Sequence, residues 1–349
     1  MALHCEVDGT SEQVTRLLTV CIPTHNRRKA LEECLESVLP QADALGVGVC
    51  VSDNGSSDGT WQVLETLKRQ YPWMQIMCHT RDIGYRDNLT GVVLSSRAHY
   101  VWPIGDKLVL LPGALEFVVA ELVRLHPDAM IVNSLNEVVS IAEKVYSAPQ
   151  LCLTELGWHT THLGATVVPR QAYIDVLHVQ SLSKDWSQVV AFFCYLASLS
   201  APQVLFSDRV LIQWGKCVTE NHLANSWTGR ALEVLGRNWY NAIMSLPALY
   251  STNDKLRAVR SYSEQGGMLG WAGLMRVRAQ GQLTFQQLEA DRVPLRAAVS
   301  VPWWLAMVIS VAPRWLLRPI LYVHPHRMMR ALQRRLGVLR SQQAHPSAH

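Results

Sequence analysis

The stretch LLTVCIPTHNR, residues 17–27, joins a run of strand-forming residues to a polar turn. Leu17–Ile22 is apolar and partly β-branched, which predicts a buried strand that ends at Pro23. Apolar residues then recur at helical spacing from Ala30 to Leu39, and we expect Pro40 to stop that helix. A strand that leads through a polar turn into a helix is typical of the first unit of an α/β fold.

The same alternation continues to about residue 125. Further strands are expected at Val47–Val51, Met74–Cys78 and His99–Ile104, and further helices around Trp61–Leu67, Asn88–Arg97 and Pro112–Leu125. This order predicts a mostly parallel sheet flanked by helices on both faces. Beyond Ala129 the pattern loosens, with strands expected at Ala165–Val168 and Val204–Ile212 and helices at Arg170–Leu177 and Trp186–Ser198.

Polar residues gather where three of these strands end, at Thr24–Arg27, Ser52–Asn54 and Gly105–Asp106. In sheets of this kind, ligands bind beyond the carboxyl ends of the strands, so the three clusters should converge on one crevice. A carboxylate such as Asp53 can accept hydrogen bonds from ribose hydroxyls or a base N–H. Alternatively, Asp53 and Asp58 only shape the turn and cap the following helix.

Composition excludes some classes of protein. Of 349 residues, 17% are charged, which is below the ~25% usual for soluble proteins, and the net charge of +4 is too small to indicate nucleic-acid binding. The eight cysteines form no C-x-x-C pair, and several lie in apolar runs, which favours a reducing, cytoplasmic setting. Residues 1–13 have no apolar core of the kind that a signal peptide needs.

Four segments resemble, in order and spacing, the motifs of glycosyltransferase family 2. They are TVCIPTHNR (19–27), VSDNGSSDGT (51–60), DIGYRDN (82–88) and YVWPIGD (100–106). The resemblance covers roughly residues 16–115. The version with Trp102 before the acidic motif is most similar to bacterial enzymes that transfer sugars, including dideoxy sugars such as abequose, onto precursors of surface polysaccharides.

The resemblance implies a GT-A fold, a nucleoside-diphosphate-sugar donor and inverting transfer. It implies a nucleotide-sugar-binding half at 16–125, an acceptor-binding half at 126–220 and a helical C-terminal region at 221–349. The residues it assigns to the donor are Pro23, Thr24, His25, Asn26, Arg27, Asp53, Asn54, Asp82, Gly84, Asn88, Gly105, Asp106 and Lys107.

The acidic motif departs from the family. Relatives have two or three Asp residues that bind Mg²⁺ or Mn²⁺, whereas this chain has Asp106 followed by Lys107. Three alternatives follow: a divalent cation held by Asp106 with the diphosphate, metal-free catalysis with Lys107, Arg81 or Arg86 as the positive charge, or a protein that binds without catalysis. A nucleotidyltransferase is disfavoured, because a Gly-rich phosphate loop does not follow the first strand.

Inverting transfer needs a general base for the acceptor hydroxyl. The family places an acidic residue at the start of a helix beyond the sheet, and Asp185 fits that position unless it is only a helix cap; Glu155 is a weaker alternative. Four further residues have two alternative roles each. Trp158 and Trp186 either stack on a sugar ring or simply pack in the protein. His159 and His162 either bind a metal ion or belong to a polar loop that lines the acceptor pocket.

The end of the chain is basic and apolar. From Arg292 to His349 there are nine Arg, no Lys and no acid, and the uncharged stretch Ala297–Pro313 contains Trp303 and Trp304. Its 17 residues fall short of the ~20 needed to span a bilayer and suit a helix in the membrane interface. Further apolar and basic residues continue this character at Trp315–Leu317, Ile320, Leu321, Arg327, Arg330, Arg334 and Arg335.

We therefore expect a peripheral protein on the inner face of the cell membrane, with anionic lipid as a partner. The acceptor would be a polyprenyl-diphosphate-linked glycan. The alternative is that the C-terminal helices pack on protein. Nucleic acid is not expected as a partner, because the Arg residues alternate with apolar ones.

Overall fold

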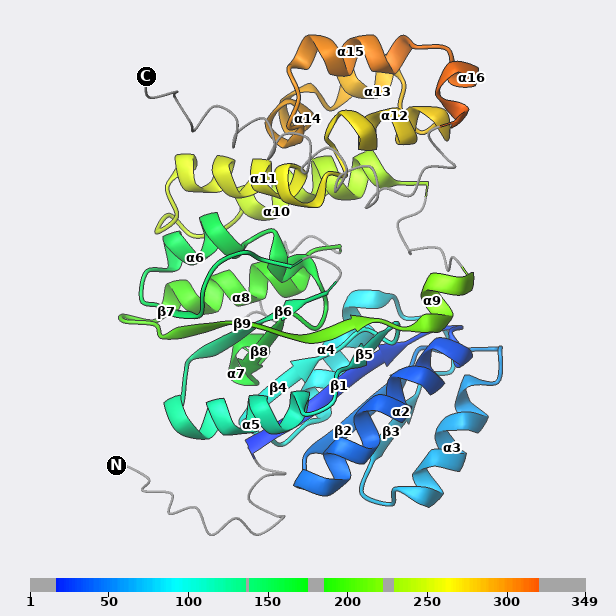
Figure 1. The fold of residues 1–349 in the computed structure, drawn as a ribbon, viewed down its shortest axis with the longest axis vertical. Helices are drawn as coiled ribbons and strands as arrows, with labels where there is room; N and C mark the ends of the chain where they lie inside the picture. Colours follow the sequence, from blue (N-terminus) through cyan, green and yellow to red (C-terminus); the bar gives the residue numbers. More distant parts are fainter. Residues whose placement is uncertain (1–16, 136–137, 175–184, 222–228, 320–349) are drawn as a thin grey trace, which may run out of the picture. The chain divides into compact units, whose positions relative to one another are not determined.

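The computed structural model describes residues 17–135, 138–174, 185–221 and 229–319. The chain divides into two compact units: residues 1–226 with 241–261, and residues 227–240 with 262–349. All the described strands lie in the first unit, and the described part of the second is helical (Figure 1).

A nine-stranded sheet forms the centre of the first unit in the described residues. The strands follow the order β3-β2-β1-β4-β8-β6-β9-β5, and β7 pairs with β9. Their bounds are β1 Leu18–Thr24, β2 Gly48–Asp53, β3 Gln75–Cys78, β4 Tyr100–Pro103, β5 Leu108–Leu110, β6 Ala129–Ser134, β7 Lys144–Tyr146, β8 Thr166–Pro169 and β9 Val204–Trp214.

Four strands, β3, β2, β1 and β4, are parallel, as the alternation of strands and helices predicted. β1 is buried along its whole length, which fits a central strand covered on both faces. Leu18, Val20 and Ile22 share one core with Leu31 and Leu35 of α2 (Arg28–Leu45). Helix α4 (Tyr85–Ser95) contacts β1 and β2.

The other half of the sheet is mixed, so the expectation of a mostly parallel sheet holds only for the first four strands. β8 is antiparallel to both β4 and β6, and β9 is parallel to β6 but antiparallel to β5 and β7. The sequence did not predict β5, β6 or β7. Two of these have three residues each, and β6 is a short apolar run, which periodicity cannot distinguish from a buried helix.

The prediction that Pro40 ends the first helix is wrong. Helix α2 continues to Leu45 and ends at Gly46, which has a left-handed φ of 68°. Pro40 cannot donate to the carbonyl of Glu36, but both residues are exposed, and water can satisfy that carbonyl.

The remaining helices of the first unit surround the sheet. They are α3 Thr60–Gln70, α5 Ala114–Leu125, α6 Pro149–Leu156, a 3₁₀ turn at His159–Thr161, α7 Gln171–Ile174, α8 Ser187–Ser198 and α9 Lys216–Asn221. The segments α10 Trp239–Met244 and α11 Thr252–Gly266 run across the division between the units. The end of the helix expected at Arg170–Leu177 lies outside the described residues.

The second unit contains a π-helical turn at Glu233–Asn238, α12 Trp271–Ala279, α13 Phe285–Ala290, α14 Arg292–Ala298, α15 Trp303–Val311 and α16 Arg314–Leu317. The single interfacial helix expected over Ala297–Pro313 is wrong, because Val299–Pro302 separates α14 from α15 and Pro302 caps α15. No single described helix is long and apolar enough to cross a membrane; α14 and α15 pass that test only together, with a bend of 111° between them.

Candidate active site

The polar clusters that follow the parallel strands meet at one edge of the sheet. Thr24 and Asp53 are the last residues of β1 and β2, and they lie beside each other in the strand register. Asp106 follows β4, and its carboxylate accepts a hydrogen bond from the Thr24 hydroxyl at 2.9 Å. The predicted convergence is therefore present, and we call residues 23–27, 52–56, 79–88 and 105–107 the polar edge.

Hydrogen bonds join the turn after β1 to the turn after β2. Asn26 adopts a φ of 50°, a left-handed conformation that Asn tolerates better than most residues. Its side-chain oxygen accepts from the backbone N–H of Ser57 at 2.8 Å, and its own N–H donates to the Ser56 hydroxyl at 2.8 Å. His25 Nδ1 donates to the carbonyl of Asn54 at 2.8 Å. The two turns are thus positioned together.

Asp53 is fully buried, and its carboxylate accepts from the backbone N–H of Ser56 at 3.1 Å. Gly55 has a φ of 71°, and a Cβ there would stand 2.8 Å from the backbone carbonyl carbon of Arg81. Only glycine fits this close approach. Asp58 accepts from the N–H and the hydroxyl of Thr60 at 3.1 and 2.6 Å at the start of α3. The turn-shaping role therefore holds for both aspartates, and it leaves a ligand-binding role for Asp53 open.

The segment from Asp82 to Asn88 is fixed to the same turns. Asn54 donates to the Asp82 carboxylate at 2.5 Å, and Gly84, with a φ of 89°, donates its N–H to that carboxylate at 2.7 Å. Asn88 is buried and accepts from the Ser52 hydroxyl at 2.6 Å. Asp82 itself remains largely exposed, which leaves it accessible to a ligand.

Asp106 is 2% exposed, and each of its carboxylate oxygens has a partner. One oxygen accepts from Thr24, and the other accepts from Arg27 Nη1 at 3.1 Å. Burial raises the pKa of the Asp106 carboxyl above its ordinary value, while Arg27 and Thr24 oppose that rise. Burial and the charge of Arg27 lower the pKa of the neighbouring Lys107 to about 8. The protein places two cations beside one buried carboxylate.

A divalent cation does not fit this arrangement. Mg²⁺ and Mn²⁺ usually bind one or two carboxylates together with water and substrate phosphates. Here the one carboxylate, Asp106, is already paired with Arg27, and the cation Lys107 stands where a second carboxylate would be, so a dication would meet two positive charges. In the part of the chain that the structure describes, no group of three or more His, Cys, Asp or Glu could hold a metal ion.

Sequence reasoning missed two polar residues of this edge, Ser56 and His79. The Ser56 hydroxyl accepts from the N–H of Asn26, and His79, directly after β3, donates its N–H to the carbonyl of Asp53 at 2.9 Å. The His79 ring lies 3.3 Å from the Ser52 hydroxyl. His79 could have been found by the rule applied to the other strands, because it is the polar residue that follows a parallel strand. Unlike Gly55, Gly105 has room for a Cβ, which would make only ordinary van der Waals contacts.

The candidates for the general base lie beyond the first four strands. Asp185 lies two residues before α8, whose N-cap position is Trp186. Glu155 accepts from Lys144 Nζ and the Tyr146 hydroxyl, both at 2.7 Å. Although burial opposes it, these hydrogen bonds lower the pKa of Glu155, which makes it a weaker base.

Three of the four aromatic and histidine candidates belong to the core, and the fourth, His162, is partly exposed. Trp158 and Trp186 are 4% and 6% exposed, so packing describes them better than stacking on a sugar. His159 is fully buried, and its Nε2 donates to the carbonyl of Val132 at 3.0 Å. The expectation of an acceptor-pocket loop is therefore wrong for His159.

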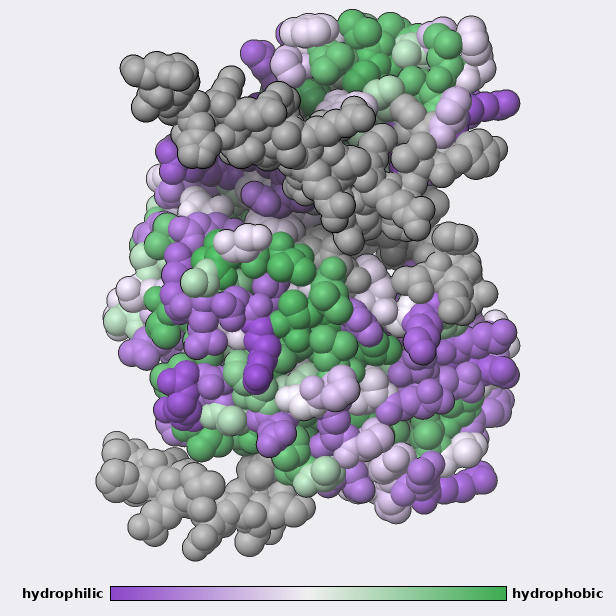
Figure 2. Space-filling model, viewed as in Figure 1, coloured by the Kyte–Doolittle hydropathy of each residue, from purple (hydrophilic) through white to green (hydrophobic). Residues whose placement is uncertain are grey.

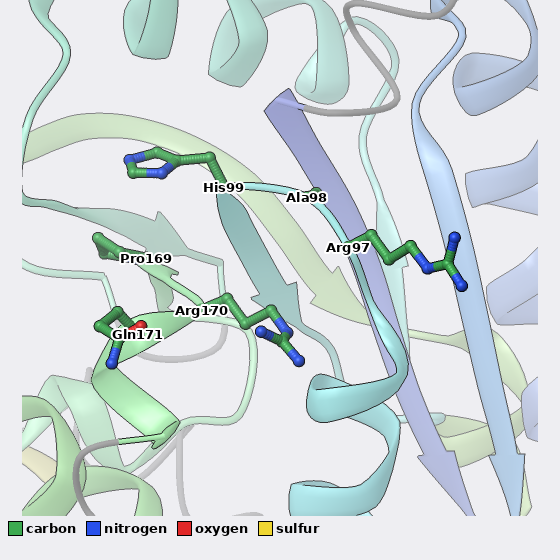
Figure 3. A pocket seen from close by; sticks show the side chains of 6 residues that line it. All are labelled: Arg97, Ala98, His99, Pro169, Arg170 and Gln171. Atoms are coloured by element: carbon green, nitrogen blue, oxygen red, sulfur yellow. The ribbon is translucent and has the colours of Figure 1, made fainter.

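A cavity of about 370 Å³ lies at the opposite end of β4, lined by Arg97–His99 before that strand and by Pro169–Gln171 at the end of β8. In Figure 3 the His99 ring points away from the side chains of Arg97 and Arg170, which extend to the same side of the view at separate places. Because they do not converge on one point, this cavity is a poor binding site compared with the polar edge.

The second unit carries a different surface. Six large apolar side chains of α14, α15 and α16 are 55–69% exposed, and we call them the apolar face: Val293, Trp304, Val308, Val311, Trp315 and Leu316. In Figure 2, hydrophobic residues gather at the top of the view, where Figure 1 places α15. Arg292, Arg296, Arg314 and Arg318 are exposed beside them in the sequence.

Comparison with known proteins agrees with this geometry. Residues 19–165 match the model of the family described as glycosyl transferase family 2. The abequosyltransferase RfbV of Salmonella typhimurium is 32% identical over 101 residues, which are 28% of this chain and 30% of that protein. The chondroitin synthase of Pasteurella multocida is 25% identical over 163 residues, 42% of this chain and 17% of that protein. The chain thus matches less than a third of the length of these relatives.

Solved structures share the fold at low identity. TarS residues 1–349 of S. aureus, in complex with UDP, superimposes with a TM-score of 0.56 at 14% identity and covers 87% of this chain and 90% of that one. The same protein in complex with UDP-GlcNAc gives a TM-score of 0.55 at 13% identity over 81% and 84%. The segment that matches glycosyl transferase family 2, residues 19–165, contains the whole polar edge, and the chain shares its mixed α/β fold with these solved structures.

Proposed function

We propose that the chain is a glycosyltransferase that uses a nucleoside-diphosphate sugar as donor. One observation carries this proposal: Thr24, Asp53 and Asp106 are buried together at the carboxyl ends of three neighbouring parallel strands, within the family 2 segment. That edge is where sheets of this kind bind nucleotides. Relatives named as transferases, and a structure of similar fold named as a UDP-GlcNAc complex, support this chemistry.

In this proposal the turns after β1 and β2 hold the nucleoside. The Asp53 carboxylate accepts from the base or the ribose, and Thr24, His25 and Asn26 line the base. The 82–88 segment lies toward the diphosphate and sugar, with the exposed carboxylate of Asp82 as a partner for sugar hydroxyls.

The reaction is a single displacement with inversion. The acceptor hydroxyl oxygen forms a bond to the anomeric carbon, the bond from that carbon to the diphosphate oxygen breaks, and the electron pair leaves with the nucleoside diphosphate. The hydroxyl proton passes to a general base, for which Asp185 is our candidate because it lies just before a helix beyond the first four strands, where the family places an acidic residue.

The acceptor in this proposal is a glycan attached to a polyprenyl diphosphate, reached at the inner face of the cell membrane. The exposed apolar face supports it, since Trp304 and Trp315 are 62% and 69% exposed and basic residues flank them. Tryptophan suits the headgroup region, and arginine binds anionic lipid. O-antigen-type polysaccharide synthesis is the corresponding process, by likeness to the abequosyltransferase.

A second function, binding without transfer, is favoured by one observation: the single acid of the metal motif is already paired with Arg27. Donor binding and donor hydrolysis distinguish the two. We expect the wild type to bind and slowly hydrolyse one member of a panel of nucleoside-diphosphate sugars, and Asp185→Asn to bind it with less than about a hundredth of the turnover. Binding with no turnover, even with a lipid-linked acceptor, would favour the binding protein; no binding to any donor would refute the transferase.

A further inference from the structure

The residue paired with Asp106 identifies the cation at this part of the polar edge. Asp106 is buried, and the cation within hydrogen-bonding distance of it is the guanidinium of Arg27, at 3.1 Å. The sequence had suggested Lys107, Arg81 or Arg86 as a replacement for the metal. Arg86 instead pairs with its neighbour Asp87 at 2.8 Å, on the surface.

We infer that Arg27, held by Asp106, is the resident cation of the diphosphate site and binds the leaving group in place of a divalent metal ion. This inference rests on the proposed function. It departs from the metal-dependent chemistry that the family motif implies, because the site has one carboxylate, which is already bonded to Arg27 and Thr24 and is followed by the cation Lys107.

The exposure of Arg27 fits this role. Its side chain is 30% exposed while its partner is 3% exposed, so the carboxylate anchors one side of a guanidinium that reaches water on the other. A guanidinium has five N–H donors in a planar fork, and Nη1 alone binds Asp106 in the described structure. The remaining donors can bind two phosphate oxygens.

Lys107 strengthens the positive potential at the same place. Its side chain is 6% exposed, and its ammonium interacts electrostatically with both Arg27 and Asp106. Arg27 and Lys107 carry two positive charges and Asp106 carries one negative charge, so the cluster has a net positive charge that a diphosphate can neutralise. A dication added to this cluster would meet repulsion from both.

The test is calorimetric titration of UDP, GDP, CDP and dTDP into the full chain, in EDTA and again in Mn²⁺. We expect one nucleotide to bind in EDTA, with an affinity that Mn²⁺ changes by less than about threefold. Arg27→Met should weaken it about 10- to 100-fold, as expected for losing hydrogen bonds to a charged group, and Arg27→Lys should restore part of that loss. Arg28→Met, which changes the adjacent exposed arginine, is the matched control and should bind like the wild type.

Asp106→Asn gives a second test that does not depend on the folding of Arg27→Met. If Asp106 were a metal ligand, this change would abolish Mn²⁺-dependent binding. If Arg27 is the cation, the variant should bind the nucleotide in EDTA with an affinity no more than about threefold below that of the wild type. Binding of the wild type only in Mn²⁺ would overturn the inference and leave the proposed function intact. Absence of binding in both conditions would overturn both.

Discussion

The polar edge and the apolar face differ in what their side chains contact. At the polar edge, Asp53, Asn88 and Asp106 are 0–3% exposed and bind other protein groups. On the apolar face, Trp304, Val311 and Trp315 are 62–69% exposed. The polar edge is pre-organised by its own hydrogen bonds, whereas the apolar face exposes apolar side-chain surface to solvent.

This difference teaches how each surface should respond to mutation. Removing one member of a buried network leaves its partner without a bond in a region of low dielectric constant, so effects are large and not additive. Removing one exposed apolar side chain subtracts area, so effects are small and nearly additive.

Arg27→Met should destabilise the protein by up to roughly 3 kcal/mol, because the Asp106 charge stays buried without its partner. The double variant Arg27→Met/Asp106→Leu should cost less than the single one, since the buried charge has gone. Urea unfolding of the single variants and the pair measures this coupling. Additive costs would show that the ion pair does not hold the polar edge together.

Asp53→Ala should weaken nucleoside-diphosphate binding about 10- to 100-fold, because the Ser56 N–H and the ligand both lose a charged acceptor. Calorimetry with the nucleoside diphosphate and with inorganic diphosphate measures it. The loss should appear for the nucleotide and be absent for inorganic diphosphate; an equal loss for both would place Asp53 away from the nucleoside.

Binding of the same ligand should weaken by about tenfold as pH rises from 7 to 9. The pKa of Lys107 is lowered to about 8, so its ammonium is present below that pH and loses its proton above it. Lys107→Arg stays charged over this range and should give a flat profile. A pH dependence that persists in Lys107→Arg would assign the titration to another group.

Trp304→Ser and Trp315→Ser should each weaken binding to vesicles of anionic phospholipid by roughly fivefold, and the double variant by the product of the two. Sedimentation with vesicles measures this. Trp73→Ser, at a tryptophan of the first unit that is 38% exposed, is the matched control and should bind vesicles like the wild type. Strong cooperativity between Trp304 and Trp315, or no loss, would contradict the view of the apolar face as a membrane surface.

The predicted and the missed elements of the fold differ in length and in the kind of strand pairing. The parallel strands β1, β2 and β4 came from local patterns, because a βα unit places its polar turn at a fixed point. β6 and β7 were not predicted, because their partner strand β9 lies 58–78 residues away in sequence. Helix α2 passed Pro40 because the ring lies on the exposed side of the helix.

Within the candidate site, the sequence identified the residue types but not their pairing. It gave a nucleotide-binding role to Arg27 and a metal-binding role to Asp106, and the structure joins the two by a hydrogen bond across 79 positions. Trp158 and His159 looked like binding residues in a polar loop, and they are buried. The local amino-acid sequence does not show whether a polar side chain is exposed to water or buried in the core.

The sequence by itself determined the parallel strands and the three polar turns at their carboxyl ends, because strand period and turn chemistry act over a few neighbouring residues. Only the tertiary structure decided that Asp106 is paired with Arg27 and Thr24, that β5–β9 make a mixed sheet, and that the C-terminal apolar stretch is two helices. These outcomes depend on which distant groups are brought within about 3 Å of one another, the distance over which a hydrogen bond forms.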